Sequence, residues 1–195
     1  MNWSLNWKKI RRRDLSGRYG RPARTSSAFG LTPIEQFVFF DESMRAGAPV
    51  PMLTINSVAP TIMRYGSEEQ KQFYVPKILN GEIHFAIGYT EPNAGTDLAS
   101  LQTRAVRDGD FFVINGQKIW VSGAHVSELM LVLASVGLDD KDRNKTEWFV
   151  IDRAESPYDV ATIKTLGFRQ HLAEVFFRDC RVPTRNRIVP EQAAA

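Results

Sequence analysis

The spacing of apolar residues along this 195-residue chain changes near residue 81. Before this point apolar residues recur every three to four positions, and after it they gather in short runs rich in β-branched and aromatic residues. The pattern predicts an α+β protein. A short helical N-terminal segment over residues 31–81 is followed by an antiparallel β-sandwich or barrel over residues 82–189.

Capping boxes mark two helix starts in the first region. Thr32 stands three residues before Glu35, and Ser67 stands three residues before Gln70, the spacing at which side chain and backbone cap each other. We expect Pro76 to break or bend the last helix. The predicted helices cover residues 31–47, 51–66 and 67–81.

Turn signals divide the second region into strands. Asp108–Gly109 and Asn115–Gly116 each lie between β-rich segments, and we predict a tight hairpin turn at both, which gives a three-stranded meander. No helix longer than one turn is expected here. Further predicted strands cover residues 84–90, 129–136, 146–152, 159–166 and 174–182.

The charge of the chain is concentrated at its N-terminus. Residues 1–30 hold eight Lys and Arg against the single acid Asp14, although the whole chain has a net charge of only +3. This stretch lacks apolar periodicity, so we expect a basic, poorly ordered leader rather than a nucleic-acid-binding arm. Residues 190–195 are expected to form a tail.

Several classes of protein are disfavoured by composition. No apolar run reaches the roughly 18 residues of a membrane span, so we expect a cytoplasmic protein, or one of an organellar matrix in a eukaryote. The single Cys180 excludes an internal disulfide. The three histidines show no metal-binding spacing, and no metal site is predicted.

Three motifs resemble the acyl-CoA dehydrogenases. They are YTEPNAGTD at 89–97, VINGQKIWVSGA at 113–124 and TLGFRQHLAEVFFRDCRVP at 165–183, in the family's order and spacing. The resemblance runs from about Gly30 to Pro183. It implies part of the family's N-terminal helical domain followed by its middle β domain.

The resemblance also implies a site for FAD. Trp120 would pack on the isoalloxazine ring, with the Ser122 hydroxyl and the Val121 backbone near its N5 atom. Gly95 would let the backbone approach the ligand, and Thr96 would contact both the flavin phosphate and the thioester arm of acyl-CoA. The implied cofactor-binding residues are Ile87, Tyr89, Thr90, Gly95, Thr96, Trp120, Val121 and Ser122.

Taken singly, these residues also have ordinary structural interpretations. A Trp at a strand end is commonly a core residue, and Thr or Ser hydroxyls commonly bond their own turn. Glu91 could serve as a general base, but we expect it to be a structural acceptor that holds the loop. We expect Lys118 to face solvent or an acidic neighbour across the hairpin.

The family reaction is the α,β-dehydrogenation of an acyl-CoA thioester, as in fatty acid β-oxidation. A carboxylate removes the α-proton while hydride leaves the β-carbon for the flavin, and an electron-acceptor flavoprotein reoxidises the cofactor. In most of the family the carboxylate is a Glu of a C-terminal helical domain. No acid in residues 31–183 matches it, so no catalytic residue is assigned to this chain.

Two hypotheses remain open on these grounds. The chain is a truncated form or one subunit of a homo- or hetero-oligomeric acyl-CoA dehydrogenase, whose base comes from a partner. Alternatively, it is a non-catalytic product, either a degenerate fragment or a structural or acyl-CoA-binding subunit.

Overall fold

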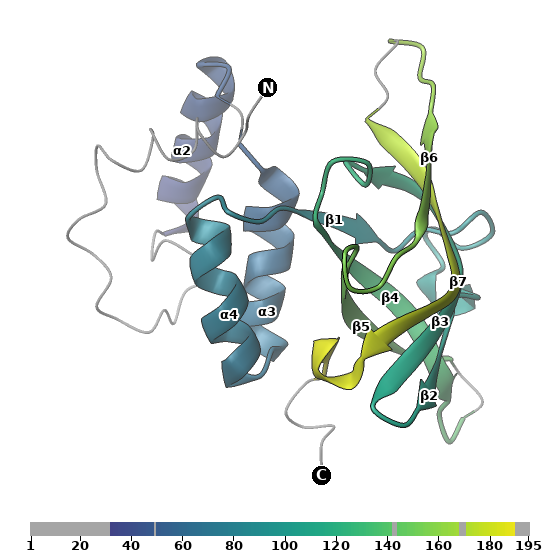
Figure 1. The fold of residues 1–195 in the computed structure, drawn as a ribbon. Coiled ribbons are helices and arrows are strands. Elements are labelled where there is room, and N and C mark those ends of the chain that lie inside the picture. The colour runs from purple at the N-terminus through teal and green to yellow at the C-terminus, as the bar shows by residue number, and fades with distance from the viewer. Residues whose placement is uncertain (1–31, 49, 142–143, 168–170, 190–195) are drawn as a thin grey trace. The chain divides into compact units, whose positions relative to one another are not determined.

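The computed structural model describes residues 32–48, 50–141, 144–167 and 171–189 (Figure 1). Our expectations for a leader over residues 1–30 and a tail over residues 190–195 lie outside the described residues. The chain divides into two compact units, one ending at His84 and the other beginning at Phe85. Each unit is described by itself.

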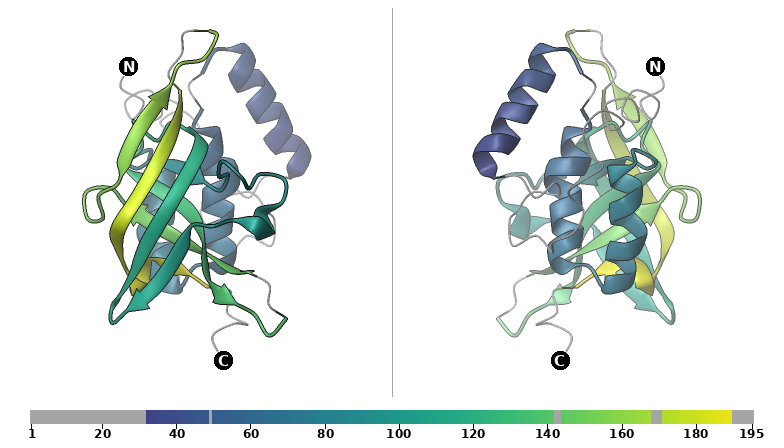
Figure 2. Two further views of the ribbon diagram at one scale, coloured as in Figure 1. Left: turned by 90° about the vertical axis from the view of Figure 1, so that its right-hand side faces the viewer. Right: turned by 90° about the vertical axis from the view of Figure 1, so that its left-hand side faces the viewer.

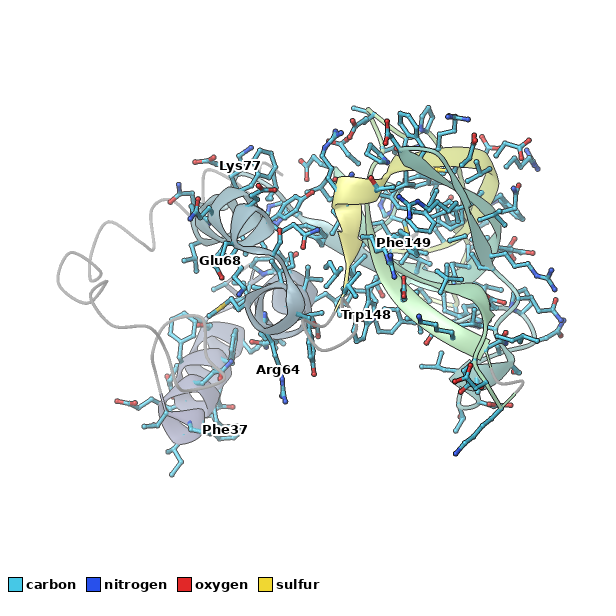
Figure 3. The ribbon with its side chains drawn as sticks, turned by 90° about the horizontal axis from the view of Figure 1, so that it is seen from below. Phe37, Arg64, Glu68, Lys77, Trp148 and Phe149 are labelled. Carbon is cyan, nitrogen blue, oxygen red and sulfur yellow. The ribbon has the colours of Figure 1, made fainter. Side chains whose placement is uncertain are left out.

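The first unit begins with helix α2 (Pro33–Arg45). The Thr32 hydroxyl accepts from the Glu35 amide at 3.3 Å, and the Glu35 carboxylate accepts from the Thr32 amide at 2.9 Å. Both halves of the predicted capping box are therefore present, because each side chain satisfies a backbone donor that the first helical turn leaves free. Phe37 on this helix is exposed (Figure 3).

The next helices also start near the predicted positions. A π-helical turn η1 (Thr54–Val58) continues into α3 (Ala59–Tyr65), and α4 (Glu68–Leu79) starts at the predicted capping box of Ser67. Helix α4 runs through Pro76 to Leu79, so the prediction that this proline breaks the helix is wrong. Its missing amide falls in the last turn, where the loss of one intrahelical bond does not end the helix.

The second unit is built on one eight-stranded sheet in the order β6-β7-β3-β2-β4-β5-β8, with β1 paired to β4 outside this path. Pairing is antiparallel except for β1 with β4 and β2 with β4. The predicted fold class, short helices followed by a mostly antiparallel β domain, is confirmed. The strands are β1 (Phe85–Gly88), β2 (Arg104–Asp108), β3 (Phe111–Ser122), β4 (Leu129–Leu138), β5 (Asn144–Asp152), β6 (Asp159–Ile163), β7 (Leu172–Pro183) and β8 (Arg187–Ile188).

Of the two predicted hairpin turns, one is confirmed. Asp108 pairs with Phe111, and Gly109 adopts a φ of 57°, so β2 and β3 form a tight hairpin. The second prediction is wrong, because β3 continues through Asn115 and Gly116 with a register shift, a β-bulge, between Ile114 and Gly116.

Contacts with distant segments explain why Asn115–Gly116 forms a bulge. The Asn115 side chain donates to the Asp179 carboxylate at 3.1 Å and accepts from the Asp179 amide at 2.8 Å. Gly116 has a φ of 151°, and a Cβ there would lie 2.5 Å from Thr103 Oγ1. The dipeptide therefore bonds to β7 and passes close to Thr103.

The sheet curls around a single apolar core (Figure 2). Strands from both ends of the path contribute to it, and Phe112 of β3 meets Phe149 of β5 edge to face at a centroid distance of 5.0 Å. Phe149 lies inside the curled sheet (Figure 3). The two described helices of this unit, η2 (Leu98–Ser100) and η3 (Thr184–Asn186), are single 3₁₀ turns, as expected.

Within the described ranges, no helix has the length and apolar character needed to cross a membrane.

Candidate functional site

The loop after β1 (residues 89–97) contains a closed turn. The Glu91 amide donates to the Ala94 carbonyl at 2.8 Å, and the Ala94 amide returns a bond to the Glu91 carbonyl at 3.2 Å. Ala94 is buried, whereas Gly95 and Thr96 are exposed directly after it. The turn therefore anchors the loop at one side and presents a side-chain-free backbone and a hydroxyl at the other.

A second irregularity, the β3 bulge (residues 118–122), lies near the end of β3. The pairing of β3 with β7 shifts register between Lys118 and Val121, and Trp120 adopts a φ of 60°. A bulky residue in the left-handed region costs roughly 1–3 kcal/mol and persists only where its surroundings hold it. The Trp120 side chain is 55% exposed, whereas Val121 beside it is buried in the core. The bulge thus directs an indole outward.

These two segments, far apart in sequence, meet through their backbones. The Ile119 amide donates to the Thr90 carbonyl at 2.9 Å, and the Lys118 ammonium donates to the Tyr89 carbonyl at 3.1 Å. The sequence predicted that Thr90 and Trp120 belong to one surface, and the residue next to Trp120 bonds directly to Thr90.

A buried ion pair lies behind this junction. The Lys118 ammonium lies 2.8 Å from Glu91 Oε1, and the two side chains are 0% and 6% exposed. Glu91 also accepts from the Gln102 amide at 2.6 Å and from the Thr103 amide at 2.9 Å. The expected role of Glu91 as a structural acceptor is confirmed. The expectation of a solvent-facing Lys118 is wrong, and its acidic partner lies in the loop after β1 rather than across the hairpin.

The bonds of the pair decide the protonation of Glu91. Burial by itself would raise the pKa of Glu91, but the hydrogen bonds from Lys118, Thr103 and Gln102 outweigh it and hold that pKa below its ordinary value of 4.5. Burial lowers the pKa of Lys118, and Glu91 opposes this effect. Glu91 is therefore an ionised acceptor at neutral pH and not a poised general base.

The lowered pKa of Glu91 predicts an acid-sensitive contribution to stability. Its ionised form contributes stability that is fully present above the ordinary value of 4.5 and is lost as pH falls through the folded-state pKa. Urea unfolding of the wild type and of Glu91→Gln should show a constant stability gap at neutral pH that narrows below pH 4.5. Other carboxylates titrate in both proteins, so a gap that stays constant into acid would contradict this assignment.

The Tyr89 side chain takes a different direction from the one that the resemblance implied for its hydroxyl. It packs in a small apolar cluster with Leu101, Leu133 and Trp148. Burial raises the pKa of its hydroxyl, partly opposed by a hydrogen bond with Trp148. Tyr89 therefore contributes its backbone to the junction, while its ring supports the loop from beneath.

The remaining predicted residues divide by exposure. Val121 is committed to the core, so its backbone alone is left for a ligand. The hydroxyls of Thr90 and Ser122 belong to half-buried residues, and Ile87 is also half-buried. Together with the exposed indole and the open backbone of Gly95, these groups offer the flat apolar wall and the donors that a flavin needs. The residues present fit the cofactor that the resemblance implies.

Sequence reasoning did not place Lys118 in this site. A signal for its burial is present, because Lys118 lies in phase with the buried Phe112 and Ile114 in the alternation of β3. An inward-facing lysine must find a carboxylate or carbonyl partner.

A separate cavity of about 380 Å³ lies where β2 and β4 diverge after the Arg104–Ser135 pair. Its wall includes Phe112, Arg107 and Asn144, and none of the predicted site residues lines it.

Comparison with known proteins agrees with this architecture. Residues 5–82 match the family model described as acyl-CoA dehydrogenase, N-terminal domain, and residues 86–180 match that of the acyl-CoA dehydrogenase middle domain. The N-terminal match begins before Gly30, where our motif-based resemblance started.

Among curated relatives, acyl-CoA dehydrogenase FadE26 of Mycobacterium tuberculosis is 42% identical over 167 residues, covering 84% of this chain and 42% of the relative. FadE29 of the same organism is 40% identical over 175 residues, covering 89% and 45%. The chain thus spans less than half the length of these relatives.

Two solved structures are similar. The ChsE4-ChsE5 complex from Mycobacterium tuberculosis matches with a TM-score of 0.76 and 42% identity, covering 84% of this chain and 42% of that chain. The Tcur3481-Tcur3483 steroid ACAD matches with a TM-score of 0.76 and 43% identity, covering 82% and 41%. With both of its units matched in order, the chain belongs to the acyl-CoA dehydrogenase family.

Proposed function

We propose that this chain is the FAD- and acyl-CoA-binding part of an enzyme that dehydrogenates an acyl-CoA thioester between its α- and β-carbons. The family depends on FAD in general. The observation that carries the proposal is the bond from the Ile119 amide to the Thr90 carbonyl, which joins two sequence-distant segments into one surface beside an outward-facing Trp120.

Each group on this surface has a role in the proposal. When bound, FAD supplies the acceptor for the hydride that leaves the substrate. Trp120 forms an apolar wall that excludes water from one side of the ring, and the hydroxyls of Thr90 and Ser122 orient its polar edge. Thr96, exposed after the closed turn, is available to both the flavin phosphate and the thioester arm.

The proton acceptor is proposed to come from outside the described residues. Glu91 is the acid nearest to the predicted site in sequence, and its two oxygens are bonded to Lys118 and to two backbone amides. It therefore orders the loop and does not abstract a proton. Two of the similar structures are named as complexes of two chains, which supports a hetero-oligomer in which a partner completes the site.

Relatives also narrow the substrates worth testing. One similar structure is titled a steroid ACAD, and another relative is named isovaleryl-CoA dehydrogenase. We propose acyl-CoA thioesters of steroid side chains or of fatty acids as substrates. A similar chain occurs in a structure titled electron transferring flavoprotein, and we propose a protein of that class as electron acceptor.

A titration of the purified chain with FAD tests the proposal. We expect saturable quenching of flavin fluorescence and, after addition of a partner chain and a saturated acyl-CoA, bleaching of the flavin absorbance band. A chain that binds no FAD, alone or with candidate partners, contradicts the proposal.

Trp120→Asn should separate folding from cofactor binding. Asn tolerates the left-handed backbone better than Trp, and the exposed indole makes few core contacts, so stability should stay the same or rise. The affinity for FAD should fall by about 10-fold or more, because aromatic stacking on a base is worth ~1–3 kcal/mol. Thermal unfolding and FAD titration measure the two effects, and an unchanged affinity would remove Trp120 from the site.

Gly95→Ala probes the approach of the backbone to the ligand. A Cβ at Gly95 would meet Thr90 Cγ2 at 4.0 Å, an ordinary contact, so stability should change by less than about 0.5 kcal/mol. Its methyl group would occupy the space proposed for the cofactor and should weaken FAD binding by about 10-fold, roughly 1.4 kcal/mol. Gly167→Ala, which meets nothing within 4 Å, is the matched control and should bind FAD normally.

The bonding of Glu91 also favours a second candidate, a subunit that binds acyl-CoA without turning it over. This candidate predicts acyl-CoA binding that neither needs FAD nor bleaches it with any partner. The same titration distinguishes the two.

A further inference from the structure

We infer that the buried Lys118–Glu91 ion pair is a positioning device for the flavin site, and that it holds the loop after β1 against the β3 bulge. This inference rests on the proposed function for the identity of the ligand. The geometry it claims can be measured in the ligand-free chain.

The pair connects four segments of backbone. Lys118 belongs to β3 immediately before the bulge and donates to Tyr89 at the end of β1 and to Glu91 in the closed turn, at 3.1 and 2.8 Å. Glu91 in turn accepts from the amides of Gln102 and Thr103, just before β2. Both irregular segments of the site are therefore tied to regular strands through two side chains.

The path of the Lys118 stem is also fixed. A Cβ at Gly88 would lie 3.3 Å from Lys118 Cγ and 3.1 Å from Met130 Sδ, so the stem runs close over the backbone of β1. A glycine there leaves the room that the buried stem takes up. The ammonium consequently reaches one place, between Tyr89 and Glu91.

The pair provides directed bonds that an apolar pair of similar volume cannot. Buried ion pairs are often replaceable by apolar side chains without loss of stability, so stability alone gives no reason for this one. Its directed bonds specify geometry, and the strained backbone of Trp120 two residues after Lys118 needs surroundings that hold it in place. Lys118 and Ile119, both bonded to the loop after β1, supply that support from one side.

The test uses the full 195-residue chain carrying Lys118→Met together with Glu91→Gln. This double variant removes both charges with little change in volume, so the chain should fold. We expect the dissociation constant for FAD to rise about 10–100-fold, as for the outer-shell partners of metal ligands. In the ligand-free chain, we expect the fluorine NMR signal of 5-fluorotryptophan at Trp120, assigned with Trp120→Phe, to shift or split.

The matched control removes an exposed ion pair from the same sheet. Asp108→Asn with Arg181→Met breaks a pair at 2.8 Å whose side chains are about half exposed. This control should leave both the FAD affinity and the Trp120 signal as in the wild type.

The outcomes separate this inference from the proposed function. A double variant with a wild-type Trp120 signal and wild-type FAD affinity overturns the inference, even if it is less stable. A wild-type chain that binds no FAD overturns the proposed function, and the Trp120 signal of the ligand-free chains then decides the inference alone. Should the double variant not fold, Glu91→Gln by itself must change the Trp120 signal in the same direction, or the inference fails.

Discussion

Lys118→Met should lower the free energy of unfolding of the β unit by about 3–5 kcal/mol, the usual cost of removing one partner of a buried ion pair. The Met side chain fills nearly the same volume, so the loss is electrostatic. Glu91, 6% exposed, would keep its charge and its two backbone amides while losing the cation that compensates it. Urea unfolding followed by circular dichroism measures the change.

An exposed lysine provides the comparison. Lys71 lies 2.7 Å from Glu68 in a surface pair on α4, and Lys71→Met should cost less than about 1 kcal/mol. Lys118→Met combined with Glu91→Gln should be more stable than Lys118→Met alone, because the uncompensated charge is gone. Equal effects of the two single lysine substitutions would show that the buried pair contributes no more than a surface pair.

Local signals identified most of the secondary structure. The capping boxes at Thr32 and Ser67 and the hairpin turn at Gly109 depend on residues within four positions of one another, so the sequence shows them directly. The strands were recognised by runs of β-branched and aromatic residues for the same reason. Strand β8 (Arg187–Ile188) was not predicted, because two residues carry no period of their own and pair only where β5 offers an edge.

Asn115–Gly116 shows where local signals stop. Its composition is as typical of a hairpin turn as that of Asp108–Gly109, yet the chain runs straight on. The outcome depends on Asp179, 64 positions later, and on Thr103 from the preceding segment. No window of sequence around the dipeptide contains these partners.

The candidate site divides in the same way. The resemblance supplied the residues of the loop after β1 and of the β3 bulge, but it gave no account of what holds them together. The left-handed backbone of Trp120 and the burial of Lys118 follow from the register shift between β3 and β7, which is a tertiary feature. Phase within β3 was the one local sign that this lysine faces inward.

Gly116→Ala should be the most damaging substitution that adds a single methyl group to the β unit. Its Cβ would lie 2.5 Å from Thr103 Oγ1 and 2.6 Å from Thr103 Cα, and the backbone φ of 151° is strained for any L-residue. Overpacking of about 1–3 kcal/mol and backbone strain of about 1–3 kcal/mol together predict a loss of roughly 3–5 kcal/mol. Thermal and urea unfolding measure it.

Gly109→Ala isolates the backbone part of this cost. Gly109 has a φ of 57° but a Cβ there meets nothing within 4 Å, so the loss should be about 1–2 kcal/mol. The excess in Gly116→Ala is then the clash with Thr103, whose amide bonds Glu91 at 2.9 Å. Displacement of Thr103 should therefore also disturb the ion pair and weaken FAD binding, whereas Gly109→Ala should not. Equal losses in the two variants would mean that Thr103 yields freely and that the close approach at Gly116 does not hold this part of the site in place.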